Sequence, residues 1–291
     1  MAEIKDTGER LIPEKHLQSL TYGEHLVRYK AAKELVKNKI VLDIASGAGY
    51  GTSFLSNYAK HIYGIDYSSQ AIKYSKTLYG KNKNLEFLQG NAENIPIEDS
   101  FLDVVVSLET IEHIPNPEKF VKEVVRVLKP GGVFYVSTPN DDEFTEGNEY
   151  HLHEFTFTEL NRLIRKYFKN YEYYYQGSWF ASGVLNKHNF TEPTKEINAV
   201  KSFKQPLGRA IYYLAVASNS MNLPKLEENI VASDRYSELE AQKNSLDIKT
   251  KLEKLNKDKE KLEHELLSIY KSKGWKYLEK ARKVKMRITR K

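Results

Sequence analysis

The amino-acid sequence predicts an α/β fold in which a seven-stranded, mostly parallel sheet carries helices on both faces, followed by an α-helical coiled coil and a basic tail. Between residues 40 and 217, short apolar runs alternate with stretches of helical periodicity, the order expected of strands joined by helices. The run 101–108 is almost continuously apolar, as in the interior of a parallel sheet. Beyond Pro224 the apolar residues recur in heptads instead.

The predicted elements follow one another along the chain. Residues 1–38 are expected to form lid helices, and residues 39–221 the sheet domain, with a polar insertion at 177–209. A helix at 118–128 must stop where Lys129, Pro130 and two glycines follow, because proline and paired glycines cannot continue it. Strands are predicted at 40–44, 61–66, 85–88, 101–108, 133–137, 172–176 and 211–217, and further helices after residue 50, at 71–79 and at 156–168.

Charge and composition narrow the class of protein. The net charge is +6, but residues 271–291 hold ten Lys or Arg against the single acid Glu279, so the rest of the chain is mildly acidic at 6 − 9 = −3. Nucleic-acid binding by the body of the protein is therefore not favoured. The absence of cysteine excludes disulfides, thiolate catalysis and zinc–sulfur sites. With no long apolar run and no signal-peptide core, a cytoplasmic location is expected.

A glycine-rich turn between the first strand and its helix is the strongest functional signal. It contains Asp43, Ala45, Gly47 and Gly49, and glycines at such a turn let the backbone approach a bulky ligand. Asp66 ends the second strand 23 residues after Asp43, the place from which an acid binds ribose hydroxyls. By itself the turn is also compatible with binding of a nicotinamide or flavin cofactor. It is equally compatible with no ligand, if the glycines serve only the turn and Asp66 only caps a helix.

Several motifs in the same order resemble the class I S-adenosylmethionine-dependent methyltransferases over residues 7–176. The segment 43–49 is similar to the family's first motif, with Ala45 where many members have glycine. The resemblance implies a Rossmann-like sheet and S-adenosylmethionine as cofactor, with Asp66 on the ribose and Tyr67 beside the adenine. Asn91 and Ala92 then belong to the loop at the adenine edge, and the run 128–132 is a structural hallmark.

A second group of polar residues is Glu109, Glu112 and His113. If this stretch is helical, the three side chains share one face, where they could bind a divalent cation or supply a general base. The pattern is similar to that of ubiquinone-pathway O-methyltransferases, in which matching residues hold a divalent ion. The interpretation favoured here has no metal: Glu109 orients the cofactor, and His113 is either a catalytic base or a turn cap.

A third group, His151 and His153, lies in the segment that follows the fifth strand. Ligands of open α/β sheets sit at that end of the strands, so either histidine is a candidate to bind the acceptor or take its proton, although alternation turns only one inward. The run resembles family members linked to cell-surface sugar modification, which also share the segments 7–10 and 24–29. These segments are interpreted as a lid, with Arg10 or Arg28 contacting an anion.

The C-terminal segment from residue 225 onward predicts association with a partner or a surface and offers no catalytic motif. A coiled coil over 225–270 favours a homo-oligomer or a coiled-coil partner. The amphipathic tail 271–291 favours an anionic membrane surface, and so a peripheral place at the inner membrane face, ahead of nucleic acid. The heptad positions are Ile248, Leu252, Leu255, Leu262, Leu266 and Ile269.

Together these features predict a methyltransferase that acts on a hydroxyl of a sugar or a lipid-linked cell-surface glycan. The methyl group of a sulfonium is already activated, so the protein's main duties are alignment and removal of the acceptor's proton. Two alternatives remain open from the sequence: a quinone-type or other small-molecule O-methyltransferase, and a non-catalytic coiled-coil adaptor with a relict domain.

Overall fold

The computed structural model describes residues 11–12, 20–140, 150–178 and 207–230, together with scattered positions between 252 and 275. The chain divides into two compact units, Met1–Asp234 and Arg235–Lys291. The first unit holds the whole sheet, and each unit is described by itself.

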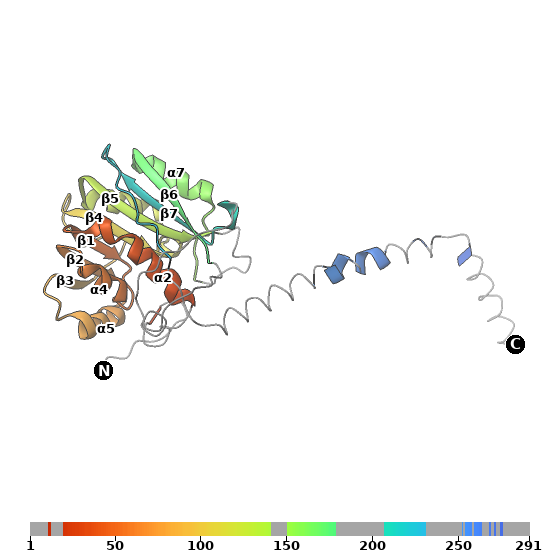
Figure 1. The fold of residues 1–291 in the computed structure, drawn as a ribbon, viewed down its shortest axis with the longest axis horizontal. Coiled ribbons are helices and arrows are strands. Elements are labelled where there is room, and N and C mark those ends of the chain that lie inside the picture. Colours follow the sequence, from red (N-terminus) through yellow and green to blue (C-terminus); the bar gives the residue numbers. More distant parts are fainter. Residues whose placement is uncertain are drawn as a thin grey trace, which may run out of the picture. The chain divides into compact units, whose positions relative to one another are not determined.

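The sheet has seven strands in the order β3-β2-β1-β4-β5-β7-β6 (Figure 1). Strands β1 to β5 pair in parallel, whereas β7 is antiparallel to both of its neighbours, β5 and β6. The predicted seven-stranded, mostly parallel sheet is therefore confirmed. The strands are β1 (Ile40–Ile44), β2 (His61–Asp66), β3 (Leu85–Gln89), β4 (Leu102–Leu108), β5 (Leu128–Pro139), β6 (Asn170–Gln176) and β7 (Tyr212–Ser218).

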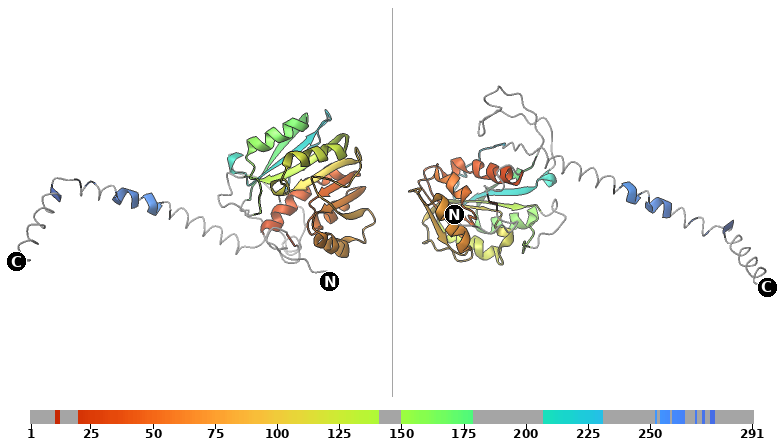
Figure 2. Two further views of the ribbon diagram at one scale, coloured as in Figure 1. Left: turned by 180° about the vertical axis from the view of Figure 1, so that it is seen from behind. Right: turned by 90° about the horizontal axis from the view of Figure 1, so that it is seen from below.

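Helices cover both faces of the sheet, as Figures 1 and 2 show from opposite sides. Alternation along the strands divides the core between the two faces. Val41 packs with α2, α3, α4 and α5, whereas its neighbour Leu42 packs with α6 and α7. The helices are α2 (Leu20–Ala31), α3 (Lys33–Val36), α4 (Tyr50–Ser56), α5 (Ser69–Tyr79), α6 (Pro117–Val127) and α7 (Phe157–Tyr167), with single 3-10 turns η1 (Ile111–His113) and η2 (Leu207–Arg209).

Local sequence explains where the helices of the second face begin. The Asn116 side chain accepts a hydrogen bond from the backbone N–H of Lys119, and Pro117 follows at the first helical position of α6. Thr156 and Glu159 form a reciprocal capping box at the start of α7. Strand β5 is longer than the predicted 133–137, because the chain turns from helix to strand at Leu128 and the proline–glycine run already belongs to the strand.

One predicted element at the site is wrong. The stretch from Glu109 to His113 is not one helix, because Glu109 has a positive φ of 48° and Thr110 a φ of −134°. Only Ile111–His113 forms a turn of 3-10 helix. The shared helical face expected for residues 109, 112 and 113 is therefore absent.

The C-terminal predictions are tested only in part. Residues 223–230 have no helical backbone, and Leu226 is buried within the first unit, so the predicted coil does not begin at 225. The described positions between 252 and 275 are helical, and Leu252, Leu255 and Leu262 are exposed there. The coiled coil and the basic tail stay predictions, because most of their residues lie outside the described ones. In the part of the chain that the structure describes, no helix is both long enough and apolar enough to cross a membrane.

Candidate functional site

The candidate site lies at the carboxyl ends of β1 to β4, where the order of the strands changes direction. The chain runs outward from β1 through β2 to β3, then returns to β4 on the other side of β1. Ligands of open α/β sheets bind at such a switch point. All the residues predicted to bind the cofactor lie at or just beyond these strand ends: Asp43, Ala45, Gly47, Gly49, Asp66, Tyr67, Asn91, Ala92 and Glu109.

The loop after β1 turns through three residues with positive φ: Ala45 at 59°, Gly47 at 56° and Gly49 at 80°. Glycine adopts this conformation readily, whereas Ala45 does so at a cost of about 1 kcal/mol. A methyl group at Gly49 would lie 2.6 Å from Ser75 Oγ, so this glycine also lets α4 approach α5. Ala45 therefore keeps the left-handed turn of the motif although it is not a glycine.

Asp43 is buried beneath this loop, with 1% of its surface exposed. Its Oδ2 accepts a short hydrogen bond of 2.6 Å from Thr52 Oγ1, and a second of 3.5 Å from the Tyr29 hydroxyl. Burial raises the pKa of Asp43 from 3.8 to about 7, and the neighbouring charge of Asp66 adds to the rise. Asp43 thus supports the loop from below instead of facing solvent.

Asp66 ties the ends of β1 and β2 together. Its Oδ2 accepts the N–H of Gly47 and its Oδ1 the N–H of Ser68, both at 2.8 Å. A carboxylate can accept about four hydrogen bonds, so these two amides do not prevent a diol from binding to it as well. The position at the end of β2 is the one from which an acid reaches a ribose diol.

Tyr67, Asn91 and Ala92 lie at the same edge, beyond β2 and β3. Tyr67 is 78% exposed, so its ring is available to stack on a flat ligand. Asp66 pairs with Gln89 across the two strands, which places the Asn91 loop next to the Tyr67 turn. Asn91 is exposed and its Oδ1 accepts the N–H of Glu93, whereas Ala92 is buried.

Helix α2 covers the end of β4 through a buried arginine. Arg28 is 1% exposed; its guanidinium pairs with Glu109, donates to Gln176 Oε1 at 2.9 Å and lies 4.2 Å from the centre of the Tyr212 ring. His25 Nε2 lies 3.2 Å from the other oxygen of Glu109. Arg28, predicted as an anion contact of the lid, thus binds a carboxylate of the protein itself. The other candidate, Arg10, lies outside the described residues.

His25 is neutral and its tautomer follows from its neighbours. Burial, with Arg28 nearby, holds the pKa of His25 well below its ordinary value. A neutral ring that donates from Nε2 to Glu109 must accept at Nδ1, and the Tyr50 hydroxyl lies there at 2.8 Å. The lid is therefore joined to α4 by a hydrogen bond, and to β4 by an ion pair and a hydrogen bond.

Glu112 and Glu109 contact different residues. It is 1% exposed; Oε2 accepts from Thr138 Oγ1 at 3.1 Å, and Oε1 has no partner among the described residues. Burial raises the pKa of Glu112 from 4.5 to about 8, against the lowering effect of its hydrogen bonds. A buried carboxyl oxygen without a partner is costly, and such a group needs an explanation.

His113 and His151 come together beside Glu112. Their ring centres lie 4.9 Å apart in an edge-to-face arrangement. His113 Nδ1 lies 3.0 Å from the Tyr150 carbonyl, and His151 Nδ1 lies 2.9 Å from Glu154 Oε1. Two backbone bonds, from the N–H groups of Leu152 and His153 to the Glu112 carbonyl, fix the second segment on the first.

The third candidate, His153, is not part of this group. Its side chain is 43% exposed, compared with 11% for His151. Its ring packs on Phe155, and Nε2 lies 3.9 Å from Glu159. Alternation along the segment thus turns His151 toward Glu112 and His153 away from it.

Sequence reasoning assigned Arg28 a different partner and gave no individual role to His25 or Thr138. His25 and Arg28 are three residues apart on one helix, but nothing in the sequence marks that face as buried. Thr138 follows an apolar strand and has no motif around it. Their roles depend on contacts across 26 to 148 residues of chain, which local spacing does not reveal.

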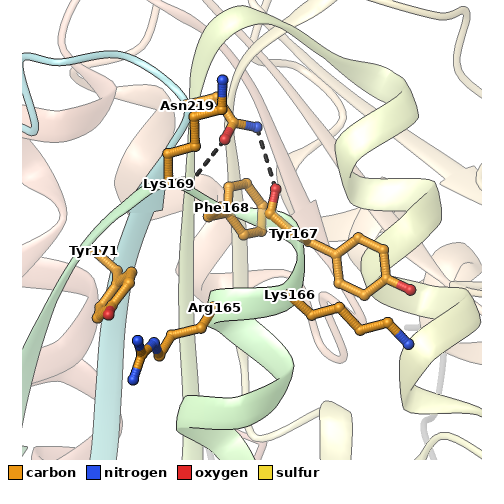
Figure 3. Close-up of a pocket in the computed structure, with 7 residues that line it drawn as sticks. All are labelled: Arg165, Lys166, Tyr167, Phe168, Lys169, Tyr171 and Asn219. Carbon is orange, nitrogen blue, oxygen red and sulfur yellow. Dashed lines mark hydrogen bonds between the residues drawn. The ribbon is translucent and has the colours of Figure 1, made fainter.

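A separate hollow lies at the opposite edge of the sheet (Figure 3). It is formed where α7 turns into β6, and Asn219 closes it by bonding to the backbone of Lys169 and Tyr167. Strand β6 begins opposite Ser218, at the amino end of the parallel strands. The hollow is therefore not part of the site described above.

The residues at the switch point fit S-adenosylmethionine. Beside the acid of Asp66 and the exposed ring of Tyr67, the loop contains one unsatisfied group: Ser46 Oγ is buried and has no hydrogen-bond partner among the described residues. Such a hydroxyl fits a polar ligand against the loop. Asp66 and Tyr67 would hold the adenosyl part, and the loop 45–49 the methionine part.

Comparison with known proteins agrees with this geometry. Residues 42–136 match a family described as "Methyltransferase domain". A probable S-adenosylmethionine-dependent methyltransferase of Mycolicibacterium smegmatis is 35% identical over 163 residues, which cover 54% of this chain and 62% of that protein. A fatty-acid O-methyltransferase of the same organism is 35% identical over 115 residues, covering 39% and 42% of the two chains. The chain thus spans about six tenths of the first relative's length.

A solved structure supports the fold. A methyltransferase from Thermotoga maritima, described as S-adenosylmethionine-dependent and as a possible histamine N-methyltransferase, superimposes with a TM-score of 0.52 at 24% identity. The match covers 73% of this chain and 97% of that one. Residues 42–136 thus match a methyltransferase domain family, and the strand order and the superposition show that the chain shares the fold of these methyltransferases.

Proposed function

We propose that this protein transfers the methyl group of S-adenosylmethionine to an oxygen atom of a hydroxyl-bearing acceptor. The observation that carries the proposal is the meeting of Gly47 and Asp66 at the switch point of the sheet, with the unsatisfied Ser46 hydroxyl in the same loop. When bound, the cofactor supplies a methyl group on a positively charged sulfur. The protein's residues then have to align the acceptor and exclude water.

The lid and the histidine group, which consists of Glu112, His113 and His151, have separate roles in this proposal. Arg28 and His25 hold Glu109 and close the end of β4 against solvent. An acceptor hydroxyl attacks in line as the bond from sulfur to the methyl group breaks, and its proton has to leave. Glu112, His113 and His151 stand at the neighbouring strand end, and in the absence of a bound ion they are the groups proposed to hold the acceptor's hydroxyl and take its proton.

The acceptor class is the finer part of the proposal. The sequence predicts a sugar or lipid-linked glycan hydroxyl, and one relative's name specifies methylation of a fatty acid at oxygen. Both acceptors present an oxygen nucleophile, and a hydroxyl oxygen also needs a proton acceptor at neutral pH. We therefore propose oxygen as the methylated atom, and one acceptor screen compares the glycan with the lipid.

Calorimetric titration of the full chain with S-adenosylhomocysteine tests the cofactor site. Asp66→Asn should weaken binding at least tenfold, because the neutral amide replaces one acceptor oxygen by a donor. Asp99→Asn is the matched control: that acid is 75% exposed on the loop before β4 and pairs with Arg126. Labelled methyl transfer to sugar nucleotides, lipid-linked glycans and long-chain acids then ranks the acceptors. A folded wild-type protein that binds no S-adenosylhomocysteine contradicts the proposal and favours the adaptor.

A further inference from the structure

We propose that Glu112, His113 and His151 bind one divalent transition-metal ion at the carboxyl ends of β4 and β5. Each of the three side chains offers one ligand atom, and these atoms lie within 4.8 Å of one another. The three come from two segments separated by 37 residues of chain, so the cluster is made by the fold. It differs from the sequence-based group of residues 109, 112 and 113, since Glu109 is bound to Arg28 and His25.

The state of Glu112 is the first independent support. One oxygen is held by Thr138, and the other is buried without a hydrogen-bond partner among the described residues. A carboxylate in this position is stabilised by a cation, because the cation replaces the solvent that burial has removed. Among the described residues, no other group of three such side chains meets in this way.

The acceptors beside the two Nδ1 atoms are the second support. His113 and His151 each place Nδ1 within hydrogen-bond distance of an acceptor, the Tyr150 carbonyl and the Glu154 carboxylate. A neutral ring that donates from Nδ1 carries its lone pair on Nε2. Metal-bound histidines are oriented in this way by a carbonyl or carboxylate on the other nitrogen. Glu154 is thus a positioning residue for His151.

The backbone holds the two segments in place before any ion binds. The carbonyl of Glu112 accepts N–H groups from Leu152 at 2.9 Å and His153 at 3.1 Å. Together with the bond between His113 and the Tyr150 carbonyl, these contacts fix the segment 150–153 on the 3-10 turn. Preorganised ligands lose less conformational entropy on binding, which favours a site over a chance encounter of side chains.

The donor set defines the class of ion. Two imidazole nitrogens and one carboxylate suit Zn²⁺, Fe²⁺, Mn²⁺ or Co²⁺, whereas Mg²⁺ and Ca²⁺ prefer oxygen ligands alone. Three protein ligands leave coordination positions open for an acceptor oxygen. That catalytic use rests on the proposed function, but binding of the ion does not. The two can therefore be tested apart.

Cobalt titration of the full chain tests the site without measuring methyl transfer. The protein is stripped with a chelator, dialysed and titrated with Co²⁺, whose visible absorption reports coordination. We expect one equivalent to bind, with millimolar Mg²⁺ failing to compete. His113→Gln, His151→Gln and Glu112→Gln should each weaken binding at least tenfold, and Glu154→Gln by about 10- to 100-fold. Thermal unfolding and S-adenosylhomocysteine binding check that each variant is folded.

His153→Gln is the matched control, because this histidine lies in the same segment but points away from Glu112. It should bind Co²⁺ as tightly as the wild type. Affinity that stays unchanged in both His113→Gln and His151→Gln overturns the proposal, and so does a wild-type protein that binds no Co²⁺ at millimolar concentration. A wild-type protein that binds Co²⁺ but does not bind S-adenosylhomocysteine would contradict the proposed function and leave the metal site standing.

Discussion

Replacement of Asp43 by Asn should change how the stability of the cofactor-free protein depends on pH. The Asp43 carboxyl is 1% exposed, and burial raises its pKa from 3.8 to about 7. Between these values the folded state binds a proton that the unfolded state lacks, so stability from this group is full below pH 3.8 and is lost as the pH rises through 7. The amide of the Asp43→Asn variant does not titrate in this range, so the variant should lack this dependence.

The magnitude follows from the two pKa values. At pH 5 the proton held by Asp43 stabilises the folded state by about 2 to 3 kcal/mol, and at pH 8 the contribution is close to zero. The difference in unfolding free energy between Asp43→Asn and the wild type should therefore shift by about 2 to 3 kcal/mol in favour of the variant from pH 5 to pH 8. Asn can still accept the hydrogen bond from Thr52, so the comparison isolates the charge.

Urea denaturation at pH 5, 6, 7 and 8 measures this shift, and Asp103→Asn is the control. Partial burial tends to raise the pKa of Asp103, but hydrogen bonds from the Ile40 N–H and Lys129 outweigh it and lower this pKa below 3.8. Stability from Asp103 is present above 3.8 and is lost only at more acid pH, so its variant should differ from the wild type by a constant amount between pH 5 and 8. Parallel curves for Asp43→Asn and the wild type would refute the reasoning.

Two further substitutions test the lid. Gly51→Ala places a methyl group inside the ring of Tyr29 and should lower the unfolding free energy, measured by urea denaturation, by about 1 to 3 kcal/mol. In a Tyr29→Leu background most of this loss should disappear, and strictly additive effects of the two substitutions would contradict the predicted clash. Arg28→Met leaves Glu109 without its guanidinium and should lower the unfolding free energy by about 3 kcal/mol, with Arg28→Lys intermediate; equal stability of the Met variant would show that the pair is not required.

The sheet could be predicted because its signal is local. Strands such as β4 are short apolar runs flanked by helical periodicity, and the glycine-rich loop marks the end of β1. The strand order could not be read in the same way. Strand β7 inserts between β5 and β6 although it follows β6 in the sequence, and no residue in it indicates that its neighbours run the other way.

The loop and the acid proposed to hold the cofactor could be located from the sequence for the same reason, and the group of Glu112, His113 and His151 could not. Asp43, Gly47 and Asp66 are recognised by their spacing from strand ends. His151 reaches His113 only because two amides of its segment bond to the Glu112 carbonyl, a contact that depends on the whole fold. The burial of Arg28 likewise depends on Gln176 and Tyr212, which the sequence places in distant strands.

One backbone torsion separates the two halves of the site. Helical geometry would have put Glu109 and Glu112 on the same face, where two carboxylates would compete for the same partners. The positive φ of Glu109 turns its side chain to Arg28 and His25 in the lid, and the chain then enters the 3-10 turn with Glu112 facing Thr138. A non-glycine residue at φ 48° costs about 1 kcal/mol or more, and the ion pair with Arg28 offsets it. The strain thus lets neighbouring residues serve the lid and the histidine group separately.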